Sequence, residues 1–144
     1  MRQNLDYLLE KKQLDFYNSM NGMNTTALAK IVEIDSSILE ASIELIAHTE
    51  FHGSYSENPV ISAVPIMPVF NSSSFFINAP YKIGDLVIVV FCQHSLEGTI
   101  DSSEQTEPVS KDRYSFDDAI IIGNITAQYT DQYPEDLSII HKES

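Results

Sequence analysis

The chain of 144 residues contains a single cysteine, few basic residues and no long hydrophobic run. One cysteine excludes an internal disulfide and a zinc centre built from several thiolates. The most apolar stretch, residues 86–92, is far shorter than the roughly 18 residues that a membrane-spanning helix needs. The first residues alternate charged and apolar types, so we expect no secretory signal and no glycosylation at the sequons.

Basic residues are also scarce relative to acidic ones. The sequence has 8 Lys and Arg residues against 21 Asp and Glu residues, which gives a net charge of −13 at pH 7. A surface of this charge repels a phosphate backbone, and Lys11 and Lys12 form the only adjacent basic pair. We therefore expect no nucleic-acid partner. An acidic surface instead suits solubility, or docking to a basic protein surface.

Apolar residues make up 43% of the chain, enough for the core of one domain. We divide the chain into a helical arm at 1–22, a β domain at 23–125 and a polar tail at 126–144. In the arm, residues 2–21 have the spacing of an amphipathic helix that ends at a glycine. Its apolar positions are Leu5, Leu8, Leu9, Phe16, Tyr17 and Met20. Acidic residues on the polar face favour a docking arm or a lid on the core over a membrane-binding helix.

The β domain begins with a predicted hairpin. Residues 28–35 read as a strand, and residues 39–47 alternate apolar and polar side chains with a period of two. Residues 35–37 would form the turn between them. Ser37 and Glu40 also fit the capping box at the start of a helix, but the five-step alternation favours a strand.

Further strands follow at short intervals. Residues 60–70 contain Pro65 and Pro68, which cannot donate to a ladder, so they predict an edge strand or an extended crossing segment. Three more strands are expected, at 74–78, 86–92 and 118–125. Polar, turn-rich segments at 48–59 and 95–115 separate them. With no helix between consecutive strands, this pattern indicates a mainly β fold, a small barrel or sandwich, rather than a parallel α/β fold.

Cys92 and His94 could form a nucleophile–base pair, because alternate residues of a strand point to the same face. No glycine-rich nucleophile turn precedes Cys92, which instead closes an apolar run. We interpret Cys92 as a small buried hydrophobe, and His94 with Ser95 as the start of a polar rim.

Two other groups could carry chemistry. His48 and His52 have the i, i+4 spacing of a helical zinc site, but Thr49 stands where a metalloprotease has Glu, and we expect a strand end here. Asp117 and Asp118 are adjacent, so on a strand they face opposite ways and cannot jointly hold one cation. We therefore predict no catalytic residue, no metal site, no cofactor and no enzymatic activity.

The order of the segments resembles one known phage family. It is similar to the N-terminal oligonucleotide/oligosaccharide-binding (OB) fold domain of the membrane-piercing central spike proteins of contractile-tailed phages, over about residues 25–125. The matching residues are Val64-Pro65-Ile66, Phe75–Pro80, the turn Lys82-Ile83-Gly84-Asp85, Leu86–Ser95 and Arg113–Ile122. Residues 71–74 stand where members of the family often have a glycine-rich linker.

This resemblance implies an OB-like antiparallel barrel of five to six strands with an N-terminal amphipathic helix. It implies a virion component in the phage tail baseplate: a homotrimeric hub at the base of the central spike, made in the host cytoplasm. Its partners would be tail-tube and hub proteins, a spike tip or tail lysin, and other baseplate proteins, without direct membrane insertion. Because few residues follow Ile125, we expect a separate chain to supply the tip.

Two other classes compete with this interpretation. An OB-fold module for oligosaccharide or single-stranded nucleic acid would use exposed aromatic residues such as Phe75 and Phe76, although the net charge opposes nucleic acid. A cysteine hydrolase would use Cys92 and His94.

Overall fold

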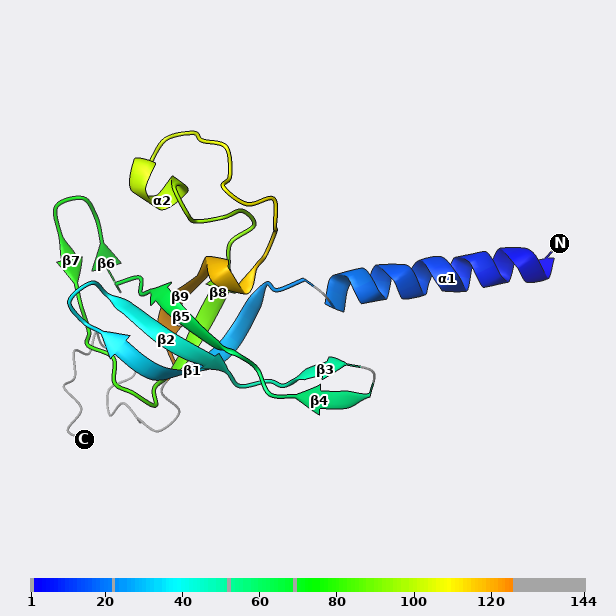
Figure 1. The fold of residues 1–144 in the computed structure, drawn as a ribbon, viewed down its shortest axis with the longest axis horizontal. Coiled ribbons are helices and arrows are strands. Elements are labelled where there is room, and N and C mark those ends of the chain that lie inside the picture. The colour runs from blue at the N-terminus through cyan, green and yellow to red at the C-terminus, as the bar shows by residue number, and fades with distance from the viewer. Residues whose placement is uncertain (1, 22, 52, 69, 126–144) are drawn as a thin grey trace, which may run out of the picture.

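The molecule consists of a long N-terminal helix and a curled β-sheet, which are seen in a computed structural model that describes residues 2–21, 23–51, 53–68 and 70–125. Helix α1 (Arg2–Asn21) has the predicted bounds and extends away from the sheet as a single rod (Figure 1). Every described side chain of α1 is exposed. Among the residues described, no helix combines the length and apolar character needed to span a membrane.

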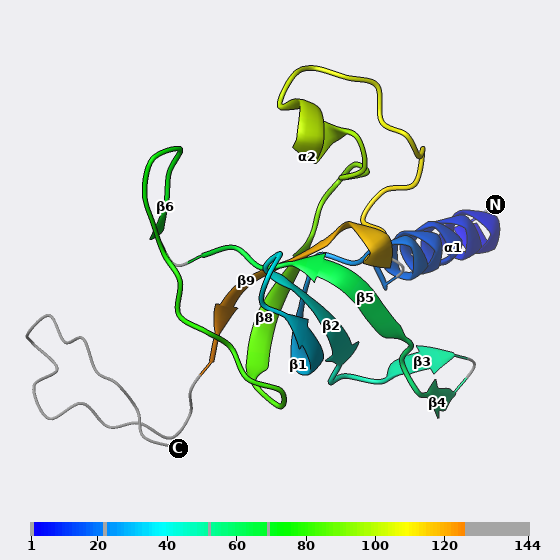
Figure 2. The same ribbon diagram turned by 60° about the vertical axis from the view of Figure 1, so that its left-hand side comes forward.

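Five antiparallel strands form the sheet, in the order β5-β2-β1-β8-β9. Their bounds are β1 (Thr26–Asp35), β2 (Glu40–Leu45), β5 (Val60–Pro65), β8 (Leu86–Phe91) and β9 (Ala119–Asn124). The two edges approach each other, because Ile66 forms a parallel bridge with Ile121 and the N–H of Met67 donates to the Ile121 carbonyl at 2.9 Å. The sheet is therefore a curled half-barrel (Figure 2), which confirms the predicted mainly β fold with an N-terminal helix.

The core lies on the concave side of the sheet. In β2 it follows the predicted period of two, because Ala41 and Ile43 are buried while Glu40, Ser42 and Glu44 are half-buried. In β8, where the sequence is apolar throughout, Val87, Val89 and Phe91 are buried and the residues between them are half-buried. The ring of Phe116 packs on that of Phe91, with 5.6 Å between the ring centroids. The buried apolar residues are Ala29, Ile31, Ala41, Ile43, Ile61, Val64, Ile66, Val87, Val89, Phe91, Ala119 and Ile121.

The predicted β1–β2 hairpin is confirmed, and the alternative helix from Ser37 is wrong. The backbone N–H and the hydroxyl of Ser37 both donate to the Asp35 carboxylate, which folds the chain into a turn instead of a helical N-cap. Strand β2 starts at Glu40, directly opposite Asp35. The prediction of an edge strand is also confirmed, because β5 lies at one edge of the sheet and its last residue is Pro65.

Several small elements were not predicted. Residues 48–59, expected to be irregular, contain the hairpin β3 (Thr49–Phe51) and β4 (Ser54–Ser56). Residues 70–77 form a second hairpin, of β6 (Phe70–Asn71) and β7 (Phe76–Ile77). Strand β7 lies within the strand predicted at 74–78 and is shorter than it, whereas its pairing with β6 was not predicted. The polar loop after β8 contains the short helix α2 (Thr99–Ser102), and the 3-10 turn η1 (Phe116–Asp118) precedes β9. These elements are too short to show a hydrophobic period. The predicted tail, 126–144, lies outside the described residues.

A hydrogen-bonded turn, residues 82–85, immediately precedes β8. The N–H of Lys82 donates to the Asp85 carboxylate at 2.8 Å, and Gly84 has a φ of 94°, a conformation that favours glycine. The N–H of Gly84 also donates to the Ile31 carbonyl of β1 at 2.8 Å. The turn thus fixes where β8 joins its neighbour in the sheet.

Because Ile43 is fully buried, Ile43→Ala should lower the free energy of unfolding by about 2–5 kcal/mol. Ile38, in the β1–β2 turn, is 59% exposed, and Ile38→Ala should change it by less than about 0.5 kcal/mol. Denaturant titration followed by circular dichroism measures both. Equal losses for the two variants would contradict the position of the core.

Candidate functional site

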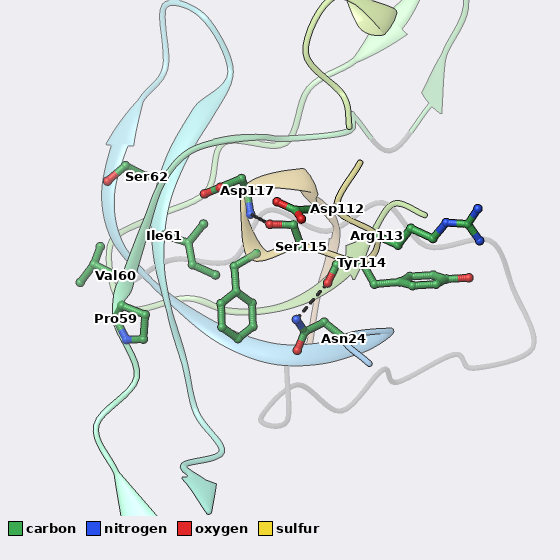
Figure 3. A pocket seen from close by; sticks show the side chains of 11 residues that line it. Asn24, Pro59, Val60, Ile61, Ser62, Asp112, Arg113, Tyr114, Ser115 and Asp117 are labelled. Atoms are coloured by element: carbon green, nitrogen blue, oxygen red, sulfur yellow. Dashed lines mark hydrogen bonds between the residues drawn. The ribbon is translucent and has the colours of Figure 1, made fainter. Parts of the chain in front are cut away.

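A hollow lies where the half-barrel remains open. It has a volume of about 700 Å³ and separates the start of the edge strand β5 from the loop before β9 (Figure 3). Residues 59–62 supply one wall, with apolar side chains from Pro59, Val60 and Ile61. Residues 112–117 supply the opposite wall, and Asn24 closes the end next to β1.

Hydrogen bonds hold the loop wall of this cavity in place. The Asn24 side-chain amide donates to the Tyr114 carbonyl at 2.9 Å, and the Asp117 N–H donates to the Ser115 hydroxyl at 3.3 Å (Figure 3). The charged side chains at the rim, Asp112, Arg113 and Asp117, are all exposed. The cavity therefore offers one apolar wall and one wall of mixed charge, an arrangement suited to a small polar molecule or an extended segment of protein.

A smaller acidic hollow of about 150 Å³ lies beside it. Its lining includes Glu97, Asp112, Asp117 and Asp118. Asp118 is buried, and its carboxylate accepts the N–H of Leu96 at 2.8 Å, whereas Asp117 is exposed. The two adjacent aspartates thus differ in environment, and the Asp118 carboxylate fastens the start of the polar loop to η1.

Cys92 lies just beyond β8, half-buried, and its N–H donates to the Asp118 carbonyl at 2.9 Å. Burial, and then the nearby charge of Asp118, raise the pKa of the Cys92 thiol. A nucleophilic cysteine needs the opposite shift. His94 is exposed, as expected of a rim residue, but the interpretation of Ser95 is wrong: Ser95 is buried, because the chain folds back there toward Asp118.

His48 is exposed, and its Nδ1 lies 3.1 Å from the Ser56 carbonyl oxygen. His52 lies outside the described residues. Within the described ranges, no group of three or more His, Cys, Asp or Glu side chains is arranged to hold a metal ion.

Exposed apolar side chains are concentrated on two projecting elements. The β6–β7 hairpin exposes Phe70, Phe75, Phe76 and Ile77, and it projects from the sheet on the side away from α1 (Figure 1). It lies within residues 58–81, which contain no charged residue. Helix α1 exposes leucine, tyrosine and phenylalanine side chains along its length. Exposed apolar groups on this scale are typical of interaction surfaces.

Sequence reasoning identified the exposed phenylalanines but missed the 700 Å³ cavity. Its walls come from residues 24, 59–62 and 112–117, which are distant in the sequence. No motif marks them, because the cavity results from incomplete closure of the barrel.

Comparison with known proteins gave one family. Residues 28–123 match the family described as "Phage protein Gp138 N-terminal domain". The matched range runs from Leu28 in β1 to Gly123 in β9, so it covers the half-barrel and excludes α1. A comparison with curated proteins returned no match.

The raised pKa of Cys92 predicts slow alkylation at neutral pH. Only the thiolate reacts, so the rate of modification by iodoacetamide should rise with a midpoint above that of the same chain unfolded in guanidinium. Stopped-time alkylation followed by mass spectrometry, over a series of pH values, gives both midpoints. A folded-state midpoint at or below the unfolded one would contradict the environment described for Cys92.

Proposed function

Because the chain belongs to the family of the phage protein Gp138 N-terminal domain, and so is a phage structural protein, we propose that it forms the base of the central spike in a tail baseplate. In this role it sits as a hub at the end of the tail tube and supports a tip or cell-puncturing component. It acts by assembly and not by catalysis.

The family match over the half-barrel is the observation that carries this proposal. The number of strands and the partial closure of the sheet add to it. An OB fold is a five-stranded, partly open barrel, and the sheet here has five strands whose edges meet only around Ile66 and Ile121. Together with the ordered segments from Val64 to Ile122, this supports an OB-like spike-base domain.

The proposed partners are two further copies of the chain, tail-tube proteins and a spike tip or tail lysin. Symmetric homo-oligomers bury apolar surface that a monomer leaves exposed. The β6–β7 hairpin and helix α1 both offer such surface. The net charge of −13 opposes nucleic acid as a partner.

The first test combines assembly and location. Light scattering on the purified chain should give three times the mass of one 16.2 kDa chain. Antibodies raised against it should label the distal end of the tail on intact particles seen by negative-stain electron microscopy. Absence of the chain from purified particles, measured by mass spectrometry, would refute the baseplate role.

A binding module for oligosaccharide or single-stranded nucleic acid is the alternative. The 700 Å³ cavity and the exposed Phe75 and Phe76 favour it, because aromatic side chains stack on sugars and bases. Fluorescence anisotropy with a labelled oligonucleotide at low salt, and with labelled cell-wall oligosaccharides, separates the two functions. Saturable binding that Phe76→Ala abolishes would favour the alternative.

Helix α1 is the proposed docking arm, because its exposed apolar side chains have no cover in the described chain. Deletion of residues 2–21 should leave the unfolding transition of the barrel unchanged, since no core residue lies in α1. It should weaken assembly, measured by light scattering of the chain alone and after mixing with baseplate proteins. Unchanged assembly in both experiments would exclude a docking role for α1.

A further inference from the structure

Strands β1, β8 and β9 carry apolar side chains on the convex face of the sheet, away from the core. In β8 the inward positions are Val87, Val89 and Phe91, so the residues between them point outward. We define the outer apolar face as Leu28, Leu86, Ile88, Val90, Ile120 and Ile122. All six are half-buried or exposed, and none is part of the core.

The pairing of the strands makes this face continuous. Leu28 lies opposite Ile88 across the β1–β8 ladder, and Ile120 lies opposite Val90 across the β8–β9 ladder. Side chains directly opposite each other on one face of a sheet are in contact range. The pairing shifts between Ile88 and Val89, so Ile122 stands in the resulting bulge and is 37% exposed.

The other half of the same convex face is polar. Where β1 meets β2, Lys30 lies opposite Glu44. Farther along, Ser42 lies opposite Glu33, and Asp35 opposite Glu40. An antiparallel sheet with one face in water normally has polar residues there. The β1–β2 half follows this rule and the β8–β9 half does not, so the outer apolar face has a different environment in the working protein.

We propose that the outer apolar face is the surface through which copies of this chain associate, an inference that rests on the proposed role as an oligomeric hub. Its aliphatic composition is that of a protein core. Permanent interfaces between identical subunits are the more hydrophobic class and resemble a domain core cut in half.

Among the surfaces of the chain, charge favours this one for contact between two copies. Each copy carries a net charge of −13, so acidic surfaces of two copies repel when they meet. The outer apolar face contains no charged residue, and contact through it keeps the carboxylates of the β1–β2 half away from the partner. The same net charge disfavours an anionic lipid surface as the occupant.

The test compares two substitutions on the convex face of the full chain. Ile122→Asp places a carboxylate in the outer apolar face. Ser42→Asp places one in the polar β1–β2 half of the convex face. Light scattering should give the mass of one chain for Ile122→Asp and the wild-type oligomer for Ser42→Asp. Circular dichroism establishes that both variants are folded.

Cross-linking provides a second measurement that does not add a charge. In a Cys92→Ser background, Ile122→Cys should form covalent dimers with a short bismaleimide, whereas Ser42→Cys should stay monomeric on a denaturing gel. The cross-linking result does not depend on whether Ile122→Asp folds.

An oligomer that survives Ile122→Asp, gives no cross-link at position 122, or dissociates equally with Ser42→Asp overturns this interface. The hub role is then still supported if the chain is found at the tail end. A wild-type monomer overturns the interface directly. Binding of that monomer to phosphatidylglycerol vesicles, lost in Ile122→Asp, would reassign the face to lipid and also overturn it.

Discussion

The inward-facing side chains of β8 pack at the centre of the core, between the strands on the β1 side of the sheet and those on the β9 side. Val87 and Val89 lie between β1 and β9 in the sheet, and Phe91 contacts the ring of Phe116 in the segment that leads into β9. Backbone hydrogen bonds join the turn before β8 to Ile31 of β1. Another joins Cys92, which follows β8, to Asp118. Both ends of β8 are thus fixed to the strands on either side. The polar loop after Cys92 and the segment that leads into β9 therefore begin from positions that β8 fixes.

The strong local signals of the sequence were sufficient for the main elements. The helix over 2–21 and the hairpin from Leu28 each extend over enough residues to show a period of 3.6 or two, and the strand from Leu86 is marked by a continuous apolar run. The signal fails where an element has only two or three residues, as in β3 and β4. Ser95 shows a different limit. A serine after a strand reads as a rim residue, and its burial depends on Asp118, which is 23 residues later and binds the backbone of its neighbour Leu96.

The run from Leu86 to Cys92 is apolar at every position, so its sequence does not show which residues face the core. Seven apolar residues in sequence predict a strand covered on both faces. The structure identifies which residues face the core, and it leaves Leu86, Ile88 and Val90 on the convex side. The candidate cavity could not be predicted in this way. Its walls, the start of β5 and the loop before β9, are far apart in the sequence, and the cavity is the gap that remains between them in the folded chain.

Helix α1 raises a separate energetic question, because most of the stability of helices in proteins comes from packing one face against something else. The described side chains of α1 are all exposed, its first turn has no acidic residue and its last turn has no basic residue. The helix dipole therefore receives no compensation from either end. A helix of this kind gains stability only when its apolar positions are buried, and ordering it costs conformational entropy at that moment. In a hub, contacts made by the barrel would bring several such arms close together first. The arms would then add to an assembly that already exists, instead of starting one.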